Sequence, residues 1–149
     1  MAEAVGVAAS IASLVQIAAS IAKLSYTYGA EVVNARETQK RYVQEVSSFI
    51  SVLFSTQQAL LESESAGLAG SRPAALSDAT IRNCEDELRT LESDLQKRTN
   101  RFTWPFQEKE LKKHIEALGR FRQFFSDYVS SVTLYVKWLT LIEWVRWIE

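Results

Sequence analysis

The sequence has little that could interrupt a helix or build a reactive site. Its 149 residues include two prolines, five glycines, one histidine and one cysteine. The scarcity of proline and glycine leaves long stretches free to be helical. The single cysteine, Cys84, has no partner for an internal disulfide, which argues against a secreted, disulfide-stapled domain and favours a cytosolic protein. A hydrophobic content of 47% predicts one folded domain with a core.

Sequence signatures of common enzymes are also absent. The chain has no glycine-rich phosphate loop, no nucleophile elbow and no paired-histidine zinc motif. His114 lies on a charged segment far along the chain from Cys84, so we expect it to be solvated rather than to bind a metal. The formal net charge is −1, and basic residues are not interleaved with aromatic ones, which argues against nucleic-acid binding. We therefore expect a binding protein with no catalytic residues, cofactor or metal.

A run of nineteen residues without a charge, Ala4–Ala22, follows Glu3 near the start of the chain. It is close to the ~20 residues that a helix needs to span a bilayer. A helix that is apolar nearly all round is otherwise found in a soluble core. Its polar side chains recur at helical spacing and predict one polar stripe, formed by Ser10, Ser13, Gln16 and Ser20. Such a segment is a poor permanent anchor, so both interpretations stay open.

The remaining chain predicts further helices and no strand. Helical apolar spacing covers about residues 31–62, a helix opens at Ser77 or Asp78, and another follows Pro105. The third helix carries apolar residues at spacings of 3, 4, 3 and 4, a heptad seam formed by Ile81, Cys84, Leu88, Leu91 and Leu95. The fold class is therefore all-α, a four- to five-helix bundle over residues 1–133 with a tryptophan-rich helical extension at 134–149.

Charge is distributed unevenly along the second half of the chain. Residues 78–94 have a net charge of −4 and residues 95–122 a net charge of +5. One interpretation is that the two stretches pair with each other on neighbouring antiparallel helices. The alternative is a patch for acidic lipid headgroups or an acidic partner, formed by Lys97, Arg98, Arg101, Lys109, Lys112 and Lys113.

The last sixteen residues have an unusual polar pattern. A polar residue recurs every third position from Lys137 to Glu149, so the polar series winds around a helix instead of holding one face. The other positions are apolar, and a surface of this kind needs a partner chain, a second face of the bundle or a membrane interface. We predict that oligomer contacts involve Trp138, Trp144 and Trp147.

Three segments together resemble a known family. They are MAEAVGVAASIASLVQIAASIAKLSYTY at the start, Glu45–Phe49 followed by Val52-Leu53, and Trp104-Pro105-Phe106 followed by Glu110-Leu111 and the Leu118/Phe121 helix. They resemble the HeLo-like N-terminal domain of fungal STAND/NLR-type proteins. That domain is similar to the HeLo domain and, more distantly, to the four-helix bundle of the mixed-lineage kinase-like pseudokinase. The resemblance covers roughly residues 1–132.

The resemblance implies a cell-death or incompatibility effector in fungal innate immunity. Such a bundle is cytoplasmic at rest; after the receptor oligomerises, its first helix enters the plasma membrane. The implied partners are anionic membrane lipids, further copies of the chain, and an NLR or other helical domain. The residues implied to insert are Val5, Val7, Ile11, Leu14, Val15, Ile17 and Ile21. A protein–protein adaptor or oligomerisation bundle without a membrane role remains the alternative.

Overall fold

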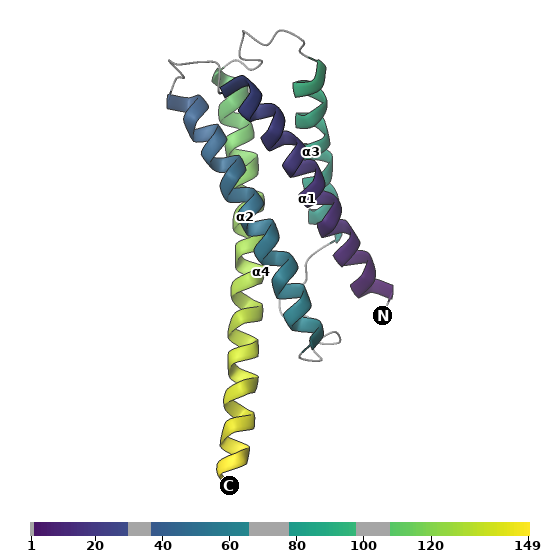
Figure 1. Cartoon of the computed structure of the whole chain (residues 1–149), viewed down its shortest axis with the longest axis vertical. Helices are drawn as coiled ribbons and strands as arrows, with labels where there is room; N and C mark the ends of the chain where they lie inside the picture. The colour runs from purple at the N-terminus through teal and green to yellow at the C-terminus, as the bar shows by residue number, and fades with distance from the viewer. Residues whose placement is uncertain (1, 30–36, 66–77, 98–107) are drawn as a thin grey trace.

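The computed structural model describes residues 2–29, 37–65, 78–97 and 108–149, with side chains at 6–26, 37–63, 79–97 and 108–149. These residues form four helices, α1 (Ala2–Gly29), α2 (Glu37–Ser65), α3 (Asp78–Lys97) and α4 (Glu108–Ile148). Figure 1 shows successive helices running in opposite directions. The predicted all-α, four- to five-helix bundle is confirmed over the described part of the chain, which forms four helices. Residues 31–36 and 105–107, predicted as helix starts, lie outside it.

The four helices do not pack in their order along the chain. α1 packs against α2 and α3, α2 packs against α4, and α3 makes few contacts with α4. Neighbouring α1 and α3 therefore run in the same direction, as do neighbouring α2 and α4 (Figure 1). Within the described residues, α1 is the main element that holds α3 to the rest of the bundle.

Large aromatic and aliphatic side chains fill the core between α2 and α4. Phe49 and Phe125 are almost completely buried and meet edge to face, with 6.3 Å between their ring centroids. Beside them, the Nε of Arg122 on α4 donates a 2.6 Å hydrogen bond to Oε1 of Glu45 on α2. The predicted seam of α3 is also confirmed, since all five of its residues, Cys84 included, are buried.

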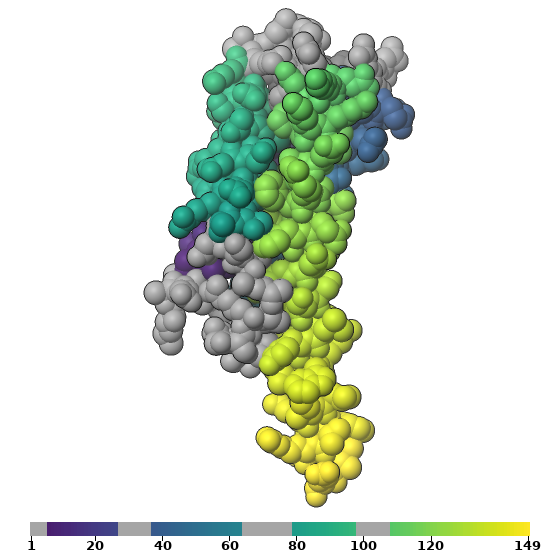
Figure 2. Space-filling model, turned by 180° about the vertical axis from the view of Figure 1, so that it is seen from behind, coloured from purple at the N-terminus to yellow at the C-terminus, as the bar shows by residue number. Residues whose placement is uncertain are grey.

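The last helix is much longer than the others. α4 has 41 residues, so at 1.5 Å per residue it is about 60 Å long, against about 44 Å for the 29 residues of α2. Figures 1 and 2 show its C-terminal turns projecting beyond the bundle. Residues 134–148 thus continue the fourth helix without a break, and all residues from 134 to 149 except Tyr135, Val136 and Leu139 are exposed.

Substitutions at Phe125 and Trp147 compare the contributions of the bundle core and of the α4 extension to stability. Phe125→Ala removes a fully buried ring and leaves a cavity, so it should lower the free energy of unfolding by about 3–5 kcal/mol. Trp147→Ala removes a ring that is 92% exposed and should change it by less than about 0.5 kcal/mol. Urea denaturation followed by circular dichroism measures both. Comparable losses in the two variants would contradict this division.

Candidate membrane and interaction surfaces

The residues predicted to insert into a membrane lie in the core. Five of the predicted residues are at most 7% exposed and belong to the hydrophobic core: Val7, Ile11, Leu14, Ile17 and Ile21. Val15 is half-buried and packs against the same core, while the side chain of Val5 lies outside the described set. In this structure α1 therefore packs one face into the core, as the soluble-core interpretation of residues 4–22 expects.

The outer face of α1 carries fewer polar and charged side chains than the outer face of α3. Its exposed positions from Gly6 to residue 22 are occupied by Gly6, Ala8, Ala9, Gln16 and Ala19, none of which carries a charge. The exposed positions of α3 include Arg82, Asp86, Glu87 and Arg89. Helix faces in water normally carry charged side chains. Among the described helices, α1 alone, over Gly6–Tyr26, is long and apolar enough to cross a membrane by length and composition.

The predicted polar stripe lies along the edge of the buried face. Ser10, Ser13 and Ser20 are half-buried, whereas Gln16 is exposed. The hydroxyl of Ser10 donates a 2.9 Å hydrogen bond to the carbonyl oxygen of Gly6, one turn earlier in the same helix. Because this bond is internal to α1, it survives if the helix changes its surroundings, and the hydroxyl stays satisfied in an apolar medium.

A buried polar contact joins the end of α1 to the start of α2. The Ser25 hydroxyl and the Tyr42 hydroxyl lie 3.1 Å apart, and both residues are buried. Burial raises the pKa of Tyr42 to about 12, although the hydrogen bond with Ser25 acts in the opposite direction. The sequence analysis did not single out this pair, because a serine and a tyrosine seventeen residues apart carry no local signal of contact.

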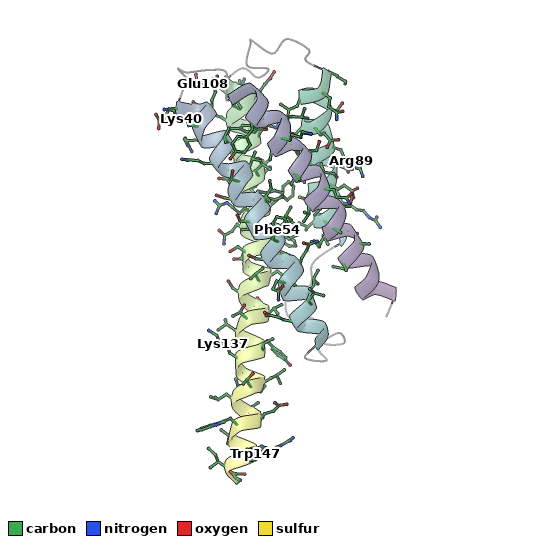
Figure 3. The ribbon with its side chains drawn as sticks, viewed as in Figure 1. Lys40, Phe54, Arg89, Glu108, Lys137 and Trp147 are labelled. Atoms are coloured by element: carbon green, nitrogen blue, oxygen red, sulfur yellow. The ribbon has the colours of Figure 1, made fainter. Side chains whose placement is uncertain are left out.

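Four residues of the predicted basic patch gather at one end of the bundle. Lys97 ends α3, and three exposed lysines lie in the first turns of α4: Lys109, Lys112 and Lys113. Arg98 and Arg101 lie outside the described residues. Lys40 and Arg41, which the sequence analysis missed, are exposed at the same end in α2. The Thr38 hydroxyl donates a 3.2 Å hydrogen bond to Glu108, which brings the starts of α2 and α4 together (Figure 3).

The acidic and basic stretches face each other across a groove. α3 and α4 are separated by an open groove of about 580 Å³, with Asp86 and Glu87 on one wall and Arg120, Phe121 and Phe124 on the other. Of the ion pairs described, Arg122–Glu45 joins α4 to α2, and Arg89–Glu85 lies within α3 with 2.8 Å between its atoms. Arg122 of α4 is thus paired with α2, while Arg120 faces Asp86 and Glu87 of α3 across the groove.

Two reactive side chains lie within the bundle. Burial is the main cause that raises the pKa of the Cys84 thiol to about 12, and Glu87 and Glu85 add to it. His114 is half-buried rather than solvated, which corrects the sequence-based expectation, because it lies where α4 faces α3. Burial lowers its pKa, against the opposing effect of Glu87, Asp94 and Glu110. Over the described residues, no three histidine, cysteine or acidic side chains are grouped to hold a metal ion.

The predicted oligomer contacts are exposed on the projecting part of α4. Trp138, Trp144 and Trp147 are 57%, 65% and 92% exposed. Trp138 contacts the ring of Tyr135 on the same helix, with 6.3 Å between centroids. Further exposed apolar residues lie before, between and after these tryptophans, namely Leu134, Leu141, Ile142, Val145 and Ile148. The basic end of the bundle and this extension lie at opposite ends of α4, so the two predicted surfaces are separate (Figure 3).

Comparison with known proteins finds no matching family model, no matching curated protein and no matching solved structure. The HeLo-like resemblance therefore stays a prediction from the sequence. The Trp-Pro-Phe motif that contributes to it, at residues 104–106, lies outside the described residues.

Alkaline pH should destabilise the bundle through Tyr42 and Cys84. Both pKa values are raised in the folded state, so each group contributes stability that is complete below its unfolded pKa, near 10 and 9 respectively. That stability is lost as the pH rises toward 12. Urea unfolding between pH 8 and pH 11 measures the decline. The Tyr42→Phe/Cys84→Ala variant should have a flatter alkaline decline than the native chain, and an equally steep one would contradict the assignment.

Proposed function

We propose that this bundle is a cell-death or incompatibility effector domain of an NLR-like protein. In this proposal the domain is cytoplasmic and folded at rest. After oligomerisation it moves to the plasma membrane, and α1 leaves the bundle to insert into and permeabilise the bilayer. The single observation that supports this most strongly is the uncharged outer face of α1, because that face has no role in the packing of the folded bundle.

The cost of releasing α1 from the bundle depends on whether water or hydrocarbon then surrounds it. Leaving the bundle for water would expose the five large buried aliphatic side chains of α1, at a cost on the order of 10 kcal/mol. In a bilayer the same side chains stay in an apolar medium. The outer face brings only glycine, alanine and one glutamine with it, so no charge has to enter the hydrocarbon. The nineteen uncharged residues span about 28 Å, close to the hydrocarbon thickness of ~30 Å.

The basic end of the bundle is suitably placed for the first contact with a membrane. It contains Lys40, Lys109, Lys112 and Lys113, exposed at the end of the bundle where α1 terminates. Each lysine near an anionic surface contributes about 1 kcal/mol of attraction. Docking through this end would bring the C-terminal turns of α1, next to the Ser25–Tyr42 contact, close to the headgroups.

The second candidate function is a protein–protein adaptor or oligomerisation bundle that never enters a membrane. The observation in its favour is the exposed apolar surface of the α4 extension, which the bundle itself leaves uncovered. On this account α1 is a permanent core helix. The two candidates differ in whether lipid is needed for activity.

Two aspartates on the outer face of α1 test the membrane proposal. Ala8 and Ala19 are exposed and lie on the side of α1 away from the predicted polar stripe, so Ala8→Asp/Ala19→Asp should leave the fold intact. Inside a bilayer each aspartate costs up to about 3 kcal/mol. We expect dye leakage from anionic vesicles to fall at least about tenfold relative to the native chain.

A matched control carries the same charges on another helix. Gln44→Asp/Ser55→Asp places two aspartates with the same separation at exposed positions of α2. It should leak like the native chain, since the change in net charge is identical. If the α1 variant is folded by circular dichroism and leaks as fast as this control, α1 does not insert and the adaptor function is favoured.

A further inference from the structure

The exposed extension of α4 carries one continuous apolar line along its length. It is formed by Leu134, Trp138, Leu141, Val145 and Ile148, called here the tail seam, whose side chains are 48–69% exposed. Their spacings are 4, 3, 4 and 3, the repeat that keeps apolar residues on one side of a helix that packs against a second helix. Nothing in the described bundle covers the tail seam.

The polar residues of the extension lie on the sides of the helix away from the tail seam. Five polar residues recur every third position, and each step turns the helix back by about 60°. Starting at Lys137 and ending at Glu149, the series therefore covers about 240° and leaves one arc of about 120° without a polar side chain. The tail seam occupies that arc, between Lys137 on one side and Glu149 on the other. An arc of this width is typical of a face buried against another helix.

The extension is already ordered for binding. It continues a helix whose first turns are packed in the bundle, so a partner does not have to nucleate it. Pairing therefore loses less conformational entropy than the folding of a free peptide on its target.

The composition of the extension fits a second copy of the chain better than a lipid surface. Lys137 and Arg146 balance Glu143 and Glu149, so two extensions approach each other without net repulsion and have no net attraction to anionic headgroups. Outside the arc of the tail seam, charges occur on the remaining sides of the helix. That distribution would force some of them into an apolar layer if the helix sank into a bilayer.

The available area is sufficient for pairing. Five large side chains, each about half exposed or more, offer roughly 600 Å² per copy, or about 1,200 Å² for two. A specific interface needs about 1,000 Å² in total.

We propose that the tail seam is a self-association surface, on which the α4 extension of a second copy packs helix against helix. The tail seam includes Trp138 but not Trp144 or Trp147, which flank or oppose it. This inference rests on the oligomerisation step of the proposed function and is independent of membrane insertion by α1.

Neighbouring residues on different sides of the extension provide the test. Leu141 lies at the centre of the tail seam, while Thr140 lies outside it and its hydroxyl bonds only to the Val136 carbonyl of its own helix. Both are exposed in the single chain, so Leu141→Glu and Thr140→Glu should each keep the native fold and melting temperature. Sedimentation equilibrium of the full chain, without lipid, measures the association constant.

We expect the native chain and Thr140→Glu to self-associate alike, and Leu141→Glu to associate on the order of a hundredfold more weakly. A native chain that stays monomeric into the high micromolar range overturns the inference, as does an equal loss in both variants. If Leu141→Glu instead abolishes vesicle binding by a monomeric chain, the occupant is lipid and the inference is wrong. The association measurement contains no lipid, so a monomeric chain would not contradict membrane insertion by α1. Equal leakage by the α1 variant and its control would likewise not contradict self-association through the tail seam.

Discussion

The burial of α1 between α2 and α3 is the contact on which the rest of the bundle depends. Its five large buried aliphatic residues contribute free energy on the order of 10 kcal/mol, comparable to the whole stability of an ordinary domain. α3 contacts α4 only slightly, so its own seam is covered largely because α1 is in place. Removing α1 would therefore expose two helices, and in water such a step is too costly to occur spontaneously.

The outer face of α1 lacks charged side chains, a property that folding in water does not require. The exposed positions of α1 from residue 6 to 22 are glycine, alanine and glutamine, whereas those of α3 include charged side chains. An uncharged outer face adds little to folding, but it removes the largest barrier to entering hydrocarbon. The charged side chains that would attract an acidic surface lie instead at one end of the bundle, and the apolar side chains suited to self-association lie at the other end of α4. In the proposed function, membrane binding, insertion and assembly therefore involve separate parts of one chain.

Much of this arrangement follows from local sequence patterns. The 3-4 spacing from Ile81 to Leu95 predicted a buried seam, and the lack of charge from Ala4 to Ala22 predicted an apolar helix. Local patterns did not predict which helices are neighbours. α2 and α4 are joined by Glu45–Arg122 and Phe49–Phe125, and the residues of each pair are more than seventy positions apart in the sequence. For the same reason the half-burial of His114 and the placing of Lys40 beside the α4 lysines were missed. The tail seam was not predicted either, because apolar residues on other sides of the helix alternate with its five members, so composition alone does not mark one seam.

The central claim is that α1 leaves the bundle when the protein meets a membrane, and the single cysteine reports on it directly. Cys84 is buried on the seam of α3, and its raised pKa keeps the thiol protonated and slow to react at neutral pH. When α1 leaves, that seam opens. We predict that anionic vesicles accelerate maleimide labelling of Cys84 in the vesicle-bound chain at least about tenfold. An unchanged, slow rate in chain that co-sediments with the vesicles would contradict the account.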